Sequence, residues 1–492
     1  QYLNCQQLSD VAKSTSEQLT SIALNEAIRP MIIESLNTLT AIGTDISACL
    51  SSVSRVNKQN ALLRANDSLE SLSQKIIETV FFPEQVILTQ ITARWRHLFT
   101  AAGGEMVRSE ALKPVVNPYT AGNPVKHSNF IGREDIMRRL EELWQSSGQA
   151  PSIVLYGHRR MGKTSILHNL QFHLGSDTTV VGFNLQLVGN IQNTGELLCM
   201  LAISLYDSLP LDQQDQLQEP NTEEFAAHNP YQRLRRFLGK LHTVCGSQRF
   251  VIAIDEFELL EELVKENVIE SALIRFFRGL IQNYPWLIMI FAGLHTLKEM
   301  QQDYWSPFFS SVSSIPVSFL SAKASERLII EPAPDFNIEF EPEVPKNIYK
   351  LTNGQPYLIQ LIGRALVTYY NRQVFEEGRA RERRFNLQDL STIVESSDFY
   401  QEGNAYFSGV WRQAETSLPK RQPHILTALC HKALSLQEVV EETEIRETEV
   451  ILILEVLLRH DVIKRVDDRY GYAVELMRRW VEENMALLNK LN

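Results

Sequence analysis

Two short segments of the sequence carry residues whose types and spacing suit phosphate chemistry. The first is Gly157-His-Arg-Arg-Met-Gly-Lys-Thr164, an instance of the pattern Gly-x-x-x-x-Gly-Lys-Thr. Phosphate oxygens need several donors in a small concave space, which backbone N–H groups supply where side chains keep clear. Gly157 allows the chain to turn away from the preceding strand, and Gly162 allows close approach of the backbone. Lys163 is expected to reach the β- and γ-phosphates, and Thr164 to bind Mg²⁺ through its hydroxyl.

The second segment, Phe250-Val-Ile-Ala-Ile-Asp-Glu256, places two carboxylates at the end of an apolar run. Open α/β sheets bind their ligands at the C-terminal tips of the strands. Asp255 is therefore predicted to hold Mg²⁺, and Glu256 to orient or deprotonate an attacking water. Glu256 and Lys163 are the two predicted catalytic residues. The alternative is an acidic pair that only caps the next helix, but the phosphate-binding pattern upstream favours catalysis.

A third candidate follows the next apolar strand, at Gly293-Leu-His-Thr296. A polar side chain at this position, His295 or Thr296, could sense the γ-phosphate or position water. Thr is equally a good N-cap residue, so an ordinary helix start is the alternative interpretation.

The elements that must position these residues form a regular series between about 125 and 320. Five near-continuous apolar runs alternate there with helical segments, which is typical of parallel strands covered on both faces. The runs are Ser152–Tyr156, Thr179–Phe183, Phe250–Ile254, Trp286–Phe291 and Ile315–Phe319. This order predicts a doubly wound α/β domain. The run at 179–183 lies between the two phosphate motifs in the sequence.

Residues 1 to about 112 are expected to be helical and polar. Leu62, Leu69 and Ile76 recur at helical spacing and predict an apolar stripe on one helix face. A helical bundle that packs these stripes within the chain is the simpler interpretation, and intermolecular helix pairing is the alternative. Gly- and Pro-rich stretches at Ala101–Gly104 and Asn117–Pro124 predict a linker and a domain boundary near 112.

The rest of the chain predicts two helical domains. Between about 321 and 418 the strand signals stop and helices are expected throughout. Between 419 and 492, three helices precede apolar segments at Val462–Val466 and Gly471–Val474 that are separated by a turn. Three helices followed by a β-hairpin are the winged-helix pattern. The expected organisation is multidomain α and α/β, with a helical N-terminal domain (1–112), a P-loop parallel-sheet NTPase core (113–320), a helical lid (321–418) and a C-terminal winged helix (419–492).

The composition narrows the range of partners. The chain of 492 residues has 48 basic and 59 acidic residues, a net charge of −11. This argues against a main surface devoted to nucleic acid or anionic membrane, although a local basic patch remains compatible with it. The five cysteines are scattered and never spaced as Cys-x-x-Cys, which favours a reducing, cytoplasmic compartment. No apolar run is long enough to predict a membrane span.

Two further segments have a distinctive local charge. The presumed recognition helix of the winged-helix segment, Arg446–Arg459, carries Glu447, Glu449 and Glu455 and is otherwise apolar, which argues against groove reading. The run Arg379-Ala-Arg-Glu-Arg-Arg384 is interpreted as a solvated loop, with binding of phosphate or an acidic partner as the alternative.

Several of these motifs together resemble those of STAND and AAA-type ATPases over roughly residues 113–492. The segment Phe130-Ile-Gly-Arg-Glu134 precedes the phosphate loop, Asp-Glu-Phe-Glu begins at Asp255, and Gly354-Gln-Pro356 matches the STAND Gly-x-Pro signature. The resemblance implies that the segment before the loop contacts adenine and that the proline lies against the base. The implied nucleotide contacts are Phe130, Ile131, Gly132, Gly157, Arg160, Gly162, Lys163, Thr164, Ser165, His295 and Pro356, with Thr164 and Asp255 on the metal.

The function that the resemblance implies is a signal-transduction switch controlled by ATP, ADP and Mg²⁺. ADP would hold the domains closed, and ATP with an unidentified trigger protein or ligand would open them and permit homo-oligomerisation, as in bacterial defence or stress signalling. No arginine stands at a clear finger or second-sensor position, so slow ATP hydrolysis is expected. The alternatives are a DNA-acting AAA-type ATPase, such as a loader or transposition regulator, and a nucleotide-binding scaffold without turnover.

Overall fold

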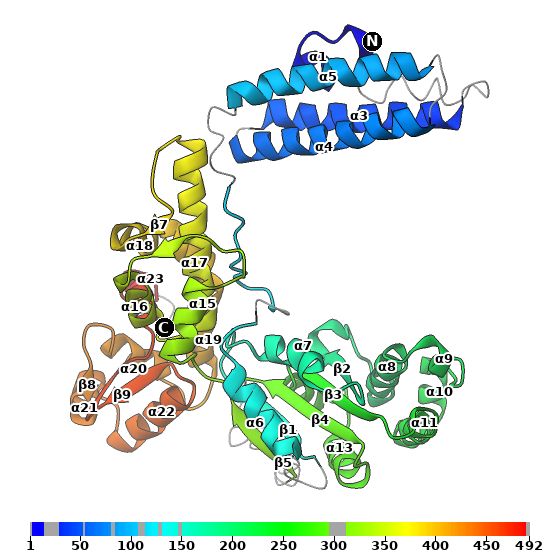
Figure 1. Ribbon diagram of the computed structural model, residues 1–492. Coiled ribbons are helices and arrows are strands. Elements are labelled where there is room, and N and C mark those ends of the chain that lie inside the picture. The colour runs from blue at the N-terminus through cyan, green and yellow to red at the C-terminus, as the bar shows by residue number, and fades with distance from the viewer. Residues whose placement is uncertain are drawn as a thin grey trace. The chain divides into compact units, whose positions relative to one another are not determined.

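The computed structural model describes residues 2–13, 29–52, 55–79, 84–106, 114–125, 130–145, 150–294 and 311–488. The chain divides into two compact units. The first combines Gln1–Val116 with Val367–Glu382, and the second combines Asn117–Leu366 with Arg383–Asn492 (Figure 1).

The first unit is a helical bundle. Its elements are η1 (Tyr2–Asn4), α1 (Leu8–Ala12), α3 (Pro30–Ser51), α4 (Arg55–Thr79), α5 (Glu84–Met106) and η6 (Arg372–Glu376). The predicted stripe of Leu62, Leu69 and Ile76 is buried in a core that also contains Ile42 and Trp95. The stripe therefore packs within the chain, and a helical N-terminal region is confirmed.

The expectation of a linker at Ala101–Gly104 was wrong, because α5 continues through these residues to Met106. A glycine in a helix costs only about 1 kcal/mol relative to alanine. That cost is small beside the packing of a long helix whose earlier turns bury Ile91, Trp95 and Phe99.

A parallel five-stranded sheet forms the centre of the second unit, and it confirms the predicted fold class. The strands are β1 (Ser152–Tyr156), β2 (Thr178–Asn184), β3 (Arg249–Asp255), β4 (Leu287–Gly293) and β5 (Val312–Pro316). Their order is β2-β3-β4-β1-β5. The strand between the two phosphate motifs in the sheet is therefore β4, whereas β2, which lies between them in the sequence, is at the edge.

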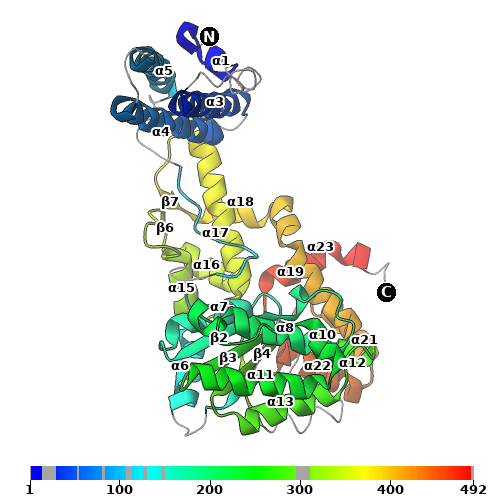
Figure 2. The same ribbon diagram turned by 90° about the vertical axis from the view of Figure 1, so that its right-hand side faces the viewer.

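Helices cover both faces of this sheet (Figures 1 and 2). On one face Ile153 and Val251 share a core with α6 (Glu134–Gln145) and α7 (Lys163–His173). On the other face Val154 and Ile252 share a core with α8 (Thr194–Asp207), α11 (Pro230–Cys245) and α13 (Ala272–Asn283). Alternate side chains of the strands serve opposite cores, as the pleat of a strand requires. Shorter elements complete this region: η5 (Leu185–Leu187), α9 (Leu211–Gln214), α10 (Thr222–Ala227) and α12 (Leu259–Lys265).

Helices dominate the lid region, as predicted. They are α15 (Ala322–Ile330), α16 (Glu343–Thr352), α17 (Pro356–Asn371), α18 (Leu387–Val394) and α19 (Ser397–Thr416). The expectation that strands stop here was wrong in one detail, because β6 (Glu339–Phe340) pairs in parallel with β7 (Arg384–Phe385). Strands of two residues are too short to show an apolar period in the sequence.

The C-terminal region contains three helices and a hairpin in the predicted order. They are α20 (Gln422–Ala428), α21 (Leu436–Thr443), α22 (Glu447–Arg459), β9 (Ile463–Val466) and β10 (Arg469–Tyr472). A short strand, β8 (Leu434–Ser435), joins the hairpin in an antiparallel sheet of order β8-β10-β9, and α23 (Glu475–Leu488) follows. Among the helices that the structure describes, none has the length and apolar character to cross a membrane.

Candidate nucleotide-binding site

The phosphate loop connects the C-terminal end of β1 to the first turn of α7. Gly162 caps α7 with φ of 89°, a left-handed conformation that glycine adopts at no steric cost. Lys163 folds back over the loop, and its Nζ donates to the carbonyl oxygens of Gly157 at 2.8 Å and His158 at 3.0 Å. Burial lowers the pKa of Lys163, while the nearby carboxylates of Glu258 and Glu256 oppose that effect. The ammonium therefore lies in the loop, close to acidic groups.

Glycine is needed at position 157 for a structural reason that the sequence motif does not reveal. A Cβ at this position would clash with the carbonyl oxygen of Val317, where the chain leaves β5. The amide of Val317 in turn donates to the carbonyl of Tyr156 at 2.7 Å. The glycine thus lets the segment after β5 pass directly beside the start of the phosphate loop.

Thr164 and Asp255 bring two hard oxygen ligands together from different elements. Thr164 Oγ1 donates to Asp255 Oδ2 at 2.7 Å, and Asp255 Oδ1 accepts from the Glu256 amide at 3.1 Å. A hydroxyl, one carboxylate and substrate phosphates are a usual ligand set for Mg²⁺, so these residues fit that ion. Within the described residues no three His, Cys, Asp or Glu side chains form a cluster that could hold a metal.

Glu256 lies in the left-handed region, with φ of 55°. Burial, and then the neighbouring charge of Glu258, raise the pKa of Glu256 to about 7. Such a pKa suits a group that takes up and releases a proton near neutral pH. The strained backbone and the shifted pKa both mark this residue as a functional candidate.

Glu258 is a site residue that the sequence analysis did not single out, although it forms part of the quoted Asp-Glu-Phe-Glu segment. Its side chain is only 8% exposed, and Oε2 accepts from the amide of Leu294 at 3.2 Å, just beyond the end of β4. Its other oxygen, Oε1, is buried and accepts no hydrogen bond within the described part of the chain. A Cβ on Gly293 would clash with Glu258, so the glycine makes room for this carboxylate.

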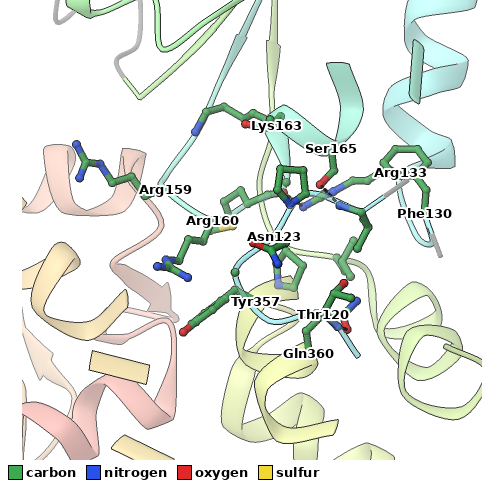
Figure 3. A pocket seen from close by; sticks show the side chains of 18 of the residues that line it. Thr120, Asn123, Phe130, Arg133, Arg159, Arg160, Lys163, Ser165, Tyr357 and Gln360 are labelled. Atoms are coloured by element: carbon green, nitrogen blue, oxygen red, sulfur yellow. Dashed lines mark hydrogen bonds between the residues drawn. The ribbon is translucent and has the colours of Figure 1, made fainter. Parts of the chain in front are cut away.

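A cavity of about 570 Å³ opens beside the phosphate loop (Figure 3). This volume is within the range of about 300–1,000 Å³ that is usual for small-molecule sites. Most of the predicted site residues line it: Phe130, Ile131, Arg160, Gly162, Lys163, Thr164, Ser165, Glu256 and Pro356. Gly157 and Asp255 are hydrogen-bonded to lining residues. His295 and Thr296 lie outside the described residues.

The end of the cavity away from Lys163 is suited to a flat apolar group. Phe130, Thr120 and Gln360 lie on that side (Figure 3), and Leu320 and Pro356 add apolar surface to the lining of the cavity. Gln360 Oε1 accepts from the Thr120 amide at 3.0 Å. A few polar groups fixed among apolar side chains are typical of sites that recognise a heterocycle.

The segment interpreted as a linker, Asn117–Pro124, forms one wall of this cavity. Gly122, Asn123 and Pro124 line it, and the next residue, Val125, donates its amide to Ser165 Oγ at 3.1 Å. The Val125 carbonyl accepts from Asn169 Nδ2 at 2.8 Å. The glycine and proline content of this segment correctly predicted an irregular backbone. It did not predict that the segment lies against α7.

Arg133 supports the phosphate loop from behind, a role that the sequence analysis missed. It is only 4% exposed, and its Nη2 donates to the carbonyls of Met161 and Ser318, each at 2.7 Å. Burial lowers the pKa of Arg133 to about 10, which leaves it charged at neutral pH. The neighbouring Gly132, with φ of 86°, packs against Leu320 and Ala324.

The Gly-x-Pro segment at the start of α17 is fixed by its backbone. Gly354 has φ of 81°, and its carbonyl accepts from the Leu320 amide at 2.8 Å. A Cβ on Gly354 would clash with the Leu320 carbonyl. Gln355 Nε2 donates to the carbonyl of Arg160 at 3.3 Å, so the lid contacts the phosphate loop directly.

The opposite side of the loop contacts α19 and the C-terminal region through His158. Its ring lies 6.5 Å from that of Tyr406, and a small cavity between them is also lined by His460 and Asp461. Burial, and then the nearby His460 and Lys163, lower the pKa of His158 to about 3, so it is neutral. Asp461 also accepts from Ser318 Oγ at 2.6 Å, just after β5.

Comparison with known proteins agrees with this geometry. Residues 129–319 match the AAA ATPase domain family. The Walker-type ATPase of Pyrococcus abyssi has a TM-score of 0.52 at 17% identity, over 74% of this chain and 99% of that one. The Orc1 protein of Aeropyrum pernix in complex with DNA has a TM-score of 0.38 at 14% identity, over 75% of this chain and 96% of that one. RuvB of Thermotoga maritima, a Holliday junction branch migration motor, has a TM-score of 0.35 at 15% identity, over 72% of this chain and 95% of that one. No curated protein matches the chain. The second unit thus contains a P-loop ATPase domain of AAA type.

Proposed function

We propose that the protein is a nucleotide-controlled signal-transduction switch of the STAND type, in which ATP, ADP and Mg²⁺ act at the cavity beside the phosphate loop. The closed arrangement corresponds to ADP, and ATP together with a trigger opens it and permits homo-oligomerisation. Hydrolysis is slow and resets the switch. The support for this proposal comes from what touches the loop.

The observation that carries it is that residues 158–161 contact two other parts of the unit, the lid and the C-terminal region. Gln355 and Tyr357 of the lid contact Arg160, Tyr406 of α19 faces His158, and His460 and Asp461 of the C-terminal region line the cavity against His158. A ligand shifts a conformational equilibrium only through different affinities for the two states. A loop that holds phosphates and also contacts the lid and the C-terminal region provides such a difference.

Each residue of the site has a distinct part in this proposal. Lys163 exchanges the carbonyls of Gly157 and His158 for phosphate oxygens. Thr164 and Asp255 hold Mg²⁺, which supplies charge neutralisation at the phosphates. Glu256, in its ionised form, accepts a proton from the attacking water. Because the raised pKa leaves part of Glu256 protonated near neutral pH, it favours slow turnover.

Arginines near the site are already engaged or displaced from the phosphate position. Arg133 is bonded to two carbonyls and Arg160 stacks on Tyr357. Arg159 is exposed and extends from the loop (Figure 3), close enough to oppose protonation of Glu256 and Lys163. The proposal therefore includes no arginine finger from the described part of this chain.

The experiment compares particle size in ADP and in ATP with Mg²⁺ by light scattering after gel filtration. Glu256→Gln is expected to retain nucleotide binding and to accumulate the ATP form as an oligomer, because the base is lost while the phosphate contacts remain. An identical size in both nucleotides for the wild type and for Glu256→Gln would contradict the switch. Retained binding without any such change would instead favour a scaffold.

A further inference from the structure

Helices α11 and α13 carry a local excess of positive charge on a chain whose net charge is −11. Neither helix contains an acidic residue. Their basic residues are Arg233, Arg235, Arg236 and Lys240 on α11 and Arg275 and Arg278 on α13. The overall balance of the chain would favour the opposite sign, so this excess is a local feature.

The two helices lie side by side (Figure 2). The rings of Tyr231 on α11 and Phe276 on α13 pack with centroids 5.0 Å apart. The buried sides of both helices, with Leu234 and Leu241 on α11 and Phe277 on α13, join the same core against the sheet. The polar sides therefore share one exposed surface.

Five of the six basic residues have no ionic partner in the described part of the chain, and four of these five are exposed. Arg233 pairs with Glu224 at 3.3 Å, and Arg278 Nε donates to Ser311 Oγ at 3.2 Å. The remaining four are exposed, and no ion pair within the described residues involves them: Arg235, Arg236, Lys240 and Arg275. We call these four residues the basic face. Their mutual repulsion contributes nothing favourable to the fold, which leaves a partner as the reason for their grouping.

The chemistry of this surface distinguishes among polyanionic partners. No large hydrophobic side chain on α11 or α13 is exposed, whereas protein interfaces depend on buried apolar or aromatic anchors. Contacts to a phosphate backbone need only cations and hydrogen-bond donors. Exposed amide donors accompany the charges, namely Gln232 and Gln282. The aromatic rings pack on one another, as His242 does on Trp286 at 4.8 Å, and leave no platform on these two helices for stacked single-stranded bases.

From these observations we infer that the basic face binds the sugar-phosphate backbone of a nucleic-acid duplex without reading its sequence. The surface is separate from α22, the helix that the sequence analysis judged unsuited to groove reading. No residue of the basic face lines the nucleotide cavity. The inference therefore stands or falls independently of the proposed switch.

The test is fluorescence anisotropy with a short labelled DNA duplex of arbitrary sequence, repeated over a range of salt concentrations. With about four phosphate contacts, log K should fall with log salt at a slope of roughly −3 to −4, which is about a hundredfold loss between 50 and 200 mM. Each contact removed should reduce the slope by about 1. A duplex of RNA in parallel shows whether the backbone type matters.

A basic-face variant replaces all four residues by glutamine and should lose duplex binding. The matched control removes four exposed cations elsewhere by Lys350→Gln, Arg412→Gln, Lys432→Gln and Lys464→Gln, and should retain it. Unchanged thermal unfolding of both variants shows that each is folded. Equal binding by the wild type and the basic-face variant would overturn the inference, as would loss of binding in the control alone.

Two further results would also overturn it. Polyglutamate that binds as tightly as the duplex would indicate an acidic protein partner. A basic-face variant that changes oligomer size but not duplex binding would indicate a subunit interface. Nucleotide binding by the basic-face variant should match that of the wild type, so failure of the duplex inference cannot be mistaken for failure of the proposed switch.

Discussion

The guanidinium carbon of Arg160 lies 4.2 Å from the centroid of the Tyr357 ring, so that a side chain of the phosphate loop stacks on the first turn of α17. Arg160 has φ of 63°, and its carbonyl is bonded to Gln355. Because Arg160 is also a predicted nucleotide contact, we propose that phosphate and Tyr357 compete for one guanidinium. Binding at the loop is thereby linked to the position of the lid.

Tyr357→Ala is predicted to lower the ATP concentration needed for opening. A cation–π contact contributes about 0.5–2 kcal/mol, which corresponds to a shift of roughly twofold to thirtyfold. The measurement is the ATP concentration at half-maximal change in particle size. Tyr357→Phe is the matched control, since it keeps the ring and loses only the hydroxyl that bonds the Glu402 carbonyl at 3.2 Å. Equal shifts in both variants would contradict a role for the stacked ring.

Gly354→Ala is predicted to destabilise the protein by about 2–5 kcal/mol, because the new Cβ meets the Leu320 carbonyl in a left-handed backbone conformation. Chemical unfolding followed by circular dichroism measures this change. Gly279→Ala in α13 is the control, since a Cβ there has no neighbour within 4 Å and should raise stability by up to about 1 kcal/mol. Wild-type stability of Gly354→Ala would refute the packing described for Gly-x-Pro.

His158 predicts a loss of stability in mild acid. Its pKa is lowered from 6.5 to about 3 in the folded protein, so the unfolded chain takes up the proton first as the pH falls. The contribution is complete above pH 6.5 and is lost progressively toward about 3, with a slope of at most about 1.4 kcal/mol per pH unit. His460, Lys163 and Arg159 face the ring and add to the shift.

Urea unfolding at a series of pH values measures this contribution. The variant His158→Gln has no titrating group at this position, so its stability should fall less steeply below pH 6.5 than that of the wild type. Comparing the slopes of unfolding free energy against pH removes the contribution of the carboxylates, which both proteins share. The same slope in both would show that His158 is not held neutral against α19 and the C-terminal region.

The parts of the site that could be predicted are those encoded locally. The phosphate loop and the pair Asp255 and Glu256 are short continuous patterns, and the five strands are apolar runs. The Gly354 and Pro356 signature also lies within one turn. In each case the feature depends on residues that are neighbours in the sequence, so the sequence alone was sufficient to predict it.

The remaining site residues depend on contacts between distant segments. Arg133 is 28 residues from Met161 and 185 from Ser318, and Thr120 is 240 residues from Gln360. No spacing rule relates positions so far apart. The linker prediction at Ala101–Gly104 failed for the opposite reason, because tertiary packing of α5 outweighed the local preference of glycine.

The assignment of residues 157–164 as the nucleotide-binding loop is tested by titrating ATP with Mg²⁺ into the wild type and into Lys163→Ala in a calorimeter. Lys163 is the buried cation of the loop, so removing its charge should abolish binding or weaken it severely while the protein stays folded. We expect clear heat of binding for the wild type and little or none for Lys163→Ala. Wild-type affinity in Lys163→Ala would contradict the assignment of this loop as the nucleotide site.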